Sequence, residues 1–309
     1  MRIIHNAWRW LANDPHQLIG VRILQMSIGA ILLFQVAITH PYAGYFWGLH
    51  GVGNGSTSPI LGSTLGDIVD TVYTADTYIF CVLFILSIGA LGLLFGYYTR
   101  IATFLALVTS FLLYNRLLEI TDGGDNIIQL VLIYMLFLLP RRAKFSSGQL
   151  RVWLHNIAVL AVIFQLMIVY TASSFAKLSG SGWRQGTAMY TLSQVQLYSL
   201  PVARGLFTIP LIVYVTSYLP LAYQLLFPVI IPTRFKLPWI VLGIFFHLGI
   251  AAFIGLVTFS TLMIGLELFL ISDQEYAKIC NRGHLMWKKL SYACAQIVQK
   301  QTKARASVH

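Results

Sequence analysis

The residues best placed to do chemistry lie in one stretch, between Tyr170 and Tyr190. Lys177 stands at the end of a long apolar segment, and a loop rich in glycine and aromatic residues follows it directly. Burial at such a boundary disfavours the charged form of an amine, so Lys177 can act as a proton acceptor near neutral pH. A lysine that ends a membrane helix with its amine among the headgroups gives the same pattern. The sequence leaves both interpretations open.

Two serines add a second chemistry to this stretch. Ser174 and Lys177 form an S-x-x-K pattern, and Ser173 lies one helical turn before Lys177. A serine and a lysine on one helix face can form a hydrolytic dyad. Because serine is common, the spacing also arises by chance.

Carboxylates gather at the start of another apolar segment, near residue 124. Asp122 or Asp125 would cap the helix that begins here and interact favourably with its dipole. Together with Glu119, the same carboxylates would offer oxygen ligands to a divalent cation. Helix capping alone explains their presence, and the cation site is the alternative.

Three polar residues fall inside apolar segments: Gln224, His247 and Glu267. Such groups are costly in a bilayer, so they mark candidate functional sites. A buried polar cluster that holds three helices together is the structural alternative. A single histidine provides no metal-ligand spacing, and we predict no metal site around it.

The composition identifies the elements that must position these residues. Hydrophobic residues make up 57% of the chain and charged residues 10%, and the mean hydropathy is +0.73. A soluble domain carries about 25% charged residues, so an all-α integral membrane protein is predicted. We expect about eight transmembrane helices. The apolar segments span about 18–39, 78–96, 101–118, 124–140, 153–177, 206–231 and 238–272, the last broken at Gly255 to Ser260.

The charge distribution predicts the orientation of this multi-pass arrangement in the cell membrane. With both termini cytoplasmic, all but four of the 21 lysines and arginines fall on the cytoplasmic side. The net charge of +11 therefore reflects topology, and its spread over separate loops argues against a nucleic-acid partner. The expected parts are an amphipathic interfacial segment 1–14, a transmembrane domain 15–273 and a basic cytoplasmic tail 274–309.

A set of short motifs in a fixed order resembles a known family. The sequence is similar to the horizontally transferred transmembrane domain, which forms the membrane part of vitamin K-dependent gamma-carboxylase. Its length is nearer that of bacterial relatives such as the sporulation-delaying protein B family. The resemblance covers most of residues 15–275 and rests on Gly96–Arg100, Asp122–Asp125, Tyr170–Lys177, Trp183–Tyr190, Phe246–Gly249 and Phe259–Leu270.

The resemblance implies a role for the first stretch. Lys177 matches the position of the lysine base that deprotonates reduced vitamin K in the carboxylase, which makes a reduced quinone a candidate cofactor. The surroundings of His247 match only loosely, so the resemblance assigns it no catalytic role. A substrate pocket is expected beside Lys177, formed by Tyr170, Ser174, Trp183, Gly186, Tyr190 and His247.

Two functions from different classes follow. The first is action at the outer face on a secreted peptide or a lipid-soluble, quinone-like substrate, as in toxin-peptide maturation with a second maturation protein, with Lys177 as proton acceptor. The second is a non-catalytic binding or immunity module that sequesters a toxin peptide or a quinone. Turnover as opposed to stoichiometric binding distinguishes them, and whether the protein is an enzyme is left open.

Overall fold

The described part of the protein is a bundle of α-helices. The computed structural model describes residues 2–48, 51–52, 76–117, 121–140, 149–195 and 199–282. The helices are α1 (Arg2–Ala12), α2 (Leu18–Thr39), a 3-10 turn (His40–Tyr42), α3 (Ala43–Trp47), α6 (Asp76–Phe95), α7 (Thr99–Arg116), α8 (Gly123–Met135), α9 (Gln149–Ser179), α10 (Ser181–Arg184), α11 (Ala188–Gln194), α12 (Pro201–Leu206), α13 (Pro210–Ile230), α14 (Lys236–Gly249), a π-helix (Ile250–Ile254) and α15 (Val257–Phe269).

Several of these helices have the length and composition of membrane spans. Within the described ranges, five helical stretches are long and apolar enough to cross a bilayer. A sixth arises if α15 and the helix Asp273–Arg282, which are bent by 95°, count as one span. The prediction of a helical membrane protein is therefore confirmed, while eight spans and cytoplasmic termini stay predictions. The five stretches are Leu18–Trp47, Tyr78–Phe95, Gln149–Ser179, Pro210–Ile230 and Lys236–Ile254.

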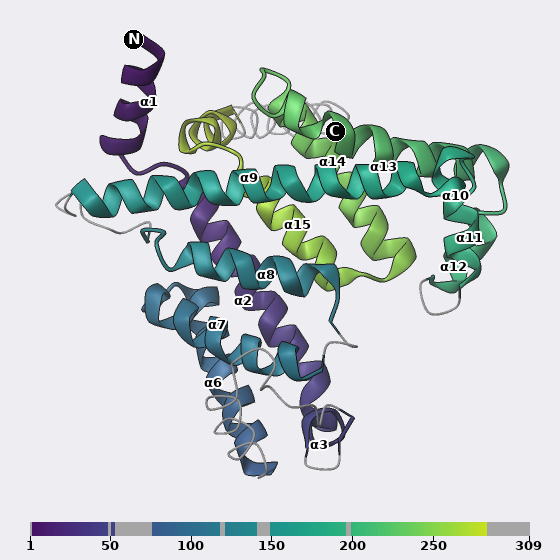
Figure 1. Ribbon diagram of the computed structural model, residues 1–309, viewed down its shortest axis with the longest axis horizontal. Helices are drawn as coiled ribbons and strands as arrows, with labels where there is room; N and C mark the ends of the chain where they lie inside the picture. The colour runs from purple at the N-terminus through teal and green to yellow at the C-terminus, as the bar shows by residue number, and fades with distance from the viewer. Residues whose placement is uncertain are drawn as a thin grey trace, which may run out of the picture.

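Helix α2 lies at the centre of one half of the bundle, packed against α6 on one side and α15 on the other (Figure 1). Small residues allow this close approach. A Cβ at Gly29 would lie 2.7 Å from the carbonyl oxygen of Ala90 in α6, and one at Gly20 would lie 2.7 Å from that of Phe269 in α15. Membrane helices pack closely where such residues face one another.

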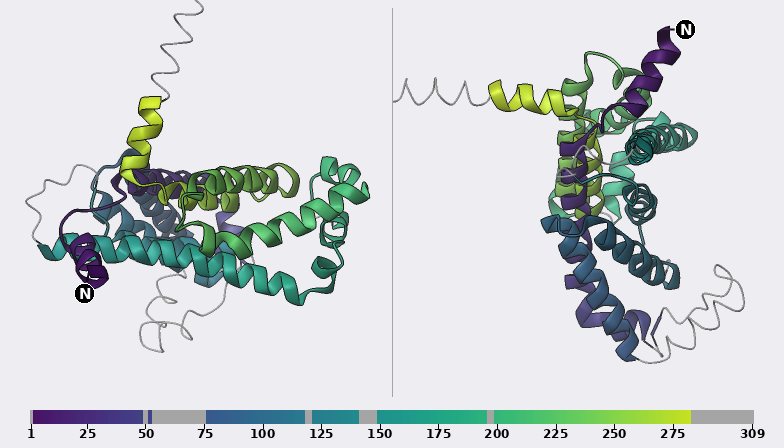
Figure 2. Two further views of the ribbon diagram at one scale, coloured as in Figure 1. Left: turned by 90° about the horizontal axis from the view of Figure 1, so that it is seen from above. Right: turned by 90° about the vertical axis from the view of Figure 1, so that its left-hand side faces the viewer.

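The other half of the bundle is built on α9. This helix of 31 residues runs across the molecule, with α13 beside it and the short helices α10, α11 and α12 at its C-terminal end (Figures 1 and 2). Helix α1 docks near its N-terminal end, where the Asn156 side chain donates to the carbonyl oxygens of Trp10, Leu11 and Asp14. One buried amide thus anchors the amphipathic N-terminal segment.

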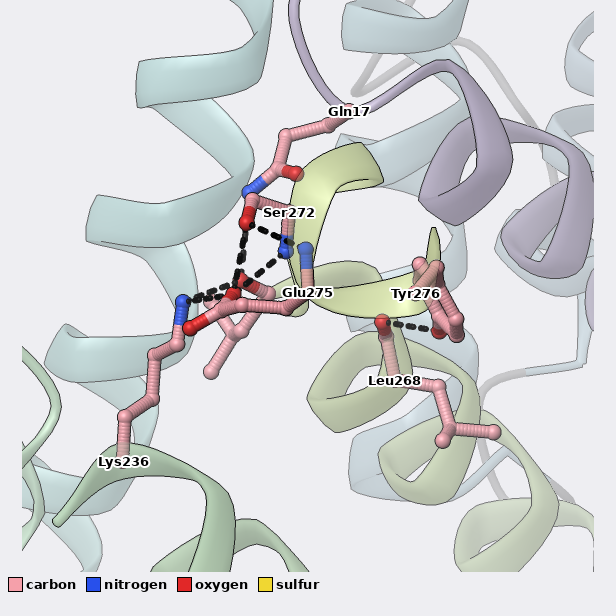
Figure 3. A network of polar contacts seen from close by, with 7 residues as sticks. Gln17, Lys236, Leu268, Ser272, Glu275 and Tyr276 are labelled. Carbon is pink, nitrogen blue, oxygen red and sulfur yellow. Dashed lines mark hydrogen bonds and ion pairs between the residues drawn. The ribbon is translucent and has the colours of Figure 1, made fainter. Parts of the chain in front are cut away.

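Contacts between distant parts of the chain close the bundle where α2 begins. Asp273 accepts hydrogen bonds from the backbone amides of Leu18 and Ile19, at 2.9 and 2.7 Å, and so caps α2 from 255 residues away. Glu275 pairs with Lys236 at the start of α14, with 2.6 Å between nitrogen and oxygen, and also accepts from Ser272 (Figure 3). The two bonds to Asp273 take the place of a local N-cap, because the side chain of Gln17 does not cap α2.

Candidate functional site

A cavity of about 410 Å³ lies between α9, α10, α13 and α14, beside the C-terminal end of α9. We call it the lysine pocket. Its polar lining comes from Ser173 and Lys177 on α9, Thr216 and Gln224 on α13, and His247 on α14, and the rest is largely apolar and aromatic. A mostly apolar cavity with a few convergent polar groups is the usual form of a small-molecule site.

Lys177 enters the pocket with neutral partners. Its amine donates to Ser173 Oγ at 2.5 Å and to Gln224 Oε1 at 3.0 Å, and lies 5.3 Å from the centre of the Trp183 ring. No carboxylate in the described ranges lies within 4 Å of this nitrogen. An amine held this way can bind an anionic or hydroxyl-bearing group, or accept its proton.

A second polar group borders the same pocket, and we call it the carboxyl cluster: Tyr170, Tyr223, His247 and Glu267. Glu267 Oε1 accepts from the hydroxyls of Tyr170 and Tyr223, at 2.5 and 2.7 Å. The Tyr170 hydroxyl also lies 2.8 Å from His247 Nε2. His247 therefore connects the pocket wall to a carboxyl group that is fully buried.

The backbone of α14 makes room for this cluster. A Cβ at Gly243 would clash with the Tyr223 hydroxyl and with both carboxyl oxygens of Glu267. The cluster is also incomplete. Neither His247 Nδ1 nor Glu267 Oε2 has a hydrogen-bond partner among the described residues, although both atoms are buried. Buried polar atoms without partners are rare, and each calls for an explanation.

The two helices that face the pocket across from α9 are irregular. Pro220 stands inside α13 and lines the pocket, and it supplies no backbone donor for the carbonyl of Thr216. Helix α14 continues into the π-helix, whose Ile250, Phe253 and Ile254 also line the pocket. Short π-helical segments are frequent at functional sites.

The structure brings together three of the residues predicted to form the site. Lys177, Trp183 and His247 all line the lysine pocket. Tyr170 lies one step behind the wall and reaches the pocket through His247. Ser174 turns away from the lysine, because its hydroxyl donates to the carbonyl oxygen of Thr171.

Two other predicted residues lie outside the pocket lining. Gly186 has a φ of 72° and packs against the rings of Tyr214 and Tyr218, where a side chain would not fit. Tyr190 is 47% exposed. Both help to shape the region of α10 and α11 without bordering the cavity.

The acidic pair on α8 has the geometry of a helix cap. The Asp122 side chain accepts from the amides of Gly124 and Asp125, and the Asp125 side chain accepts from the Asp122 amide, which forms a capping box. Asp125 also accepts from Gln35 at 2.7 Å. Glu119 lies outside the described residues, within which no group of three metal-ligating side chains occurs.

The sequence identified Gln224 and Glu267 without assigning their roles, and it missed Tyr223. Adjacent residues on α13 point to different partners: Tyr223 to Glu267, and Gln224 to Lys177. The polar pair Tyr223-Gln224 inside an otherwise apolar segment was the available signal. Its importance depends on which helices face α13, which the sequence does not reveal.

Comparison with known proteins provides one relative. The chain is 25% identical over 213 residues to the uncharacterized protein YitO of Bacillus subtilis (strain 168), a match that covers 63% of this chain and 68% of that protein. No protein-family model and no solved structure matches the chain. This similarity carries no information about activity.

Proposed function

We propose that this protein acts at the outer face of the cell membrane on a lipid-soluble, quinone-like molecule or a secreted peptide, with Lys177 as the proton acceptor. The substrate occupies the lysine pocket, and Trp183 contacts it beside the amine. A reduced quinone is the proposed cofactor class. The resemblance to the horizontally transferred transmembrane domain and the pocket geometry both support the proposal.

One observation carries it: an amine without a carboxylate partner lines a mostly apolar cavity. Structural lysines at helix ends reach into headgroups or pair with acids. Lys177 instead donates to a serine hydroxyl and a glutamine oxygen, which leaves its charge uncompensated. Such an environment favours proton exchange with a bound substrate.

The hydrolytic alternative uses the same lysine with Ser173. The 2.5 Å bond between the Lys177 amine and Ser173 Oγ gives these two residues the proximity of a dyad, whereas Ser174 does not contact the amine. Replacing Ser173 with alanine separates the two mechanisms. A dyad would lose its turnover entirely, whereas a lysine base would keep most of it.

The principal test uses Lys177→Ala and Lys177→Arg, with Lys278→Ala as a matched control outside the pocket. We expect both Lys177 variants to abolish maturation and export of active peptide from cells that also express the precursor of the secreted peptide. Alanine lacks the amine, and arginine keeps its proton and cannot act as a base. The control should behave as wild type. Unchanged peptide output from both Lys177 variants would reject the proposal.

A binding or immunity module is the second candidate function, favoured by the large apolar share of the pocket wall. Purified protein distinguishes it from an enzyme. Mass spectrometry of lipid-soluble molecules that co-purify would reveal the ligand, and incubation with that ligand measures turnover. Binding of one ligand per protein without chemical change supports the module.

A further inference from the structure

The hydrogen bonds of the carboxyl cluster favour one arrangement of protons on His247. Tyr170 has one hydroxyl proton, and it is donated to Glu267 Oε1. When Oε1 of Glu267 accepts from both phenols, the 2.8 Å contact between Tyr170 and His247 Nε2 is a bond in which the imidazole donates. In this arrangement a proton on Oε2 of Glu267 changes none of these directions, because Oε1 still accepts from both phenols.

It follows that Nδ1 of His247 is an acceptor. A doubly protonated ring would need an acceptor at Nδ1 as well, and the described residues provide none. His247 is 1% exposed and lines the lysine pocket. A buried acceptor left unpaired destabilises the structure, so a donor brought by a ligand would be favoured here.

The rest of the wall describes the ligand that would bring this donor. Aromatic and aliphatic side chains line the pocket together with His247, among them Phe246, Phe253 and Phe259. Other lining residues also face outward from the bundle: Phe245 is 68% exposed and Leu219 is 46% exposed. A pocket whose walls continue onto the lipid-facing surface admits molecules from the bilayer between α13 and α14.

We infer that His247 is a specificity-determining residue that binds, through Nδ1, the hydroxyl group of an apolar ring-containing molecule drawn sideways from the membrane. Tyr170 and Glu267 are positioning residues that hold the imidazole in the accepting tautomer. The inference deepens the proposed function and rests on it only in taking the pocket as a ligand site. It does not require Lys177 to be a base.

A pair of probes that differ in one hydrogen-bond donor tests this inference. The probes are 1-naphthol and 1-methoxynaphthalene, measured by binding to the full-length protein in lipid nanodiscs, with empty nanodiscs to subtract partitioning. We expect 1-naphthol to bind about tenfold more tightly, equivalent to about 1.4 kcal/mol. Equal affinities in the wild-type protein would overturn the inference and leave a water molecule as the partner of Nδ1.

Three variants locate the effect. His247→Phe should bring the affinity ratio to about one, while Lys278→Ala, the control outside the pocket, should keep it near tenfold. Gly249→Leu should weaken both probes, because Gly249 lines the pocket and has open space where its side chain would grow. A ratio that survives in His247→Phe would refute the role of His247.

A spectroscopic readout keeps the test valid if His247→Phe does not fold. The chain has eight histidines, and selective 15N labelling of their rings reports the proton on each nitrogen. One unprotonated Nδ1 signal should move when 1-naphthol is added and stay in place with 1-methoxynaphthalene. Its absence from the spectrum of the conservative variant His247→Gln would assign it. No shift with either probe contradicts the inference, whereas loss of peptide output in Lys177 variants concerns the proposed function alone.

Discussion

Two groups of buried and half-buried polar side chains lie in different parts of this bundle, and they differ in how completely they are paired. In the first, which we call the capping cluster, Gln35, Tyr114, Asp122 and Asp125 join α2, α7 and α8. Tyr114 donates to Gln35, Gln35 donates to Asp125, and the two aspartates exchange bonds with backbone amides. In the carboxyl cluster, two buried atoms have no partner in the described structure, and one member lines a cavity.

This difference separates structural polar groups from candidate functional ones. A cluster whose donors and acceptors are all used holds helices together and has nothing left to offer a ligand. A cluster with a spare acceptor beside a cavity is held open for a further partner. We therefore expect changes in the capping cluster to affect stability alone, and changes at the pocket to affect binding.

The largest effect should come from crowding the carboxyl cluster. Gly243→Ala places a methyl group against Tyr223 and Glu267, so we expect the free energy of unfolding to fall by about 3 kcal/mol. Gly249→Ala is the matched control on the same helix, where a Cβ meets nothing within 4 Å. Thermal unfolding of both variants in detergent measures the difference. Equal stability would show that the cluster tolerates a wider spacing than its hydrogen bonds indicate.

Breaking the capping cluster should lower stability and leave binding at the pocket unchanged. Asp125→Ala removes the acceptor of Gln35 and of the Asp122 amide, and we expect a loss of about 2 kcal/mol in unfolding free energy. Binding of 1-naphthol by the folded protein should stay within about twofold of wild type, less than 0.5 kcal/mol. Denaturant unfolding of the variant measures the first number, and titration of the nanodisc-embedded variant with 1-naphthol measures the second. A tenfold loss of binding would remove the distinction between the two clusters.

A smaller effect is expected from the cap itself. Asp122→Ala leaves Asp125 and Gln35 in place and removes the bonds to the first turn of α8, so it should cost about 1 kcal/mol. Asp122→Asn retains an oxygen acceptor and should cost less. If both substitutions also changed the affinity of the pocket for 1-naphthol, α8 would be coupled to α9, and the two clusters would not be independent.

The sequence predicted the apolar helices well and the site only partly. Helix α2 occupies the predicted 18–39, and the break at Gly255 falls where the long apolar run was expected to divide. Helix α8 ends early, at Met135 instead of 140, near the backbone amide of Leu139, which donates to His155. Such a long-range bond leaves no local pattern, because its partner lies in another helix.

The same limitation affects the site. Lys177, Trp183 and His247 could be found because amine, indole and imidazole are conspicuous in or beside apolar segments. That Tyr170 binds His247 while Ser174 faces a backbone carbonyl depends on the rotation of α9. An apolar helix with a weak amphipathic pattern does not reveal which face it buries.

The smallest expected effect concerns a third polar group, at the start of α14. Burial acts to raise the pKa of Glu275, but the hydrogen bonds from Lys236 and Ser272 outweigh it, so the pKa lies below its ordinary value. The pair therefore stabilises the fold fully above pH of about 4.3, and this contribution is lost as pH falls through the lowered pKa. Glu275→Gln should remove this acid dependence, which amounts to about 0.5 kcal/mol for a partly exposed pair. If the slope of stability against pH between about pH 5 and pH 3 were the same in Glu275→Gln as in the wild-type protein, the acid dependence would come from other carboxylates.

The length of α9 has a consequence for the depth of the amine. Its 31 residues extend about 46 Å, whereas the hydrocarbon core of a bilayer is about 30 Å thick. The helix must incline or protrude to resolve this mismatch. Lys177 lies within its last turn, so the level of the amine relative to the headgroups follows the chain length of the surrounding lipid. Membrane thickness would therefore change the depth at which the amine lies in the bilayer.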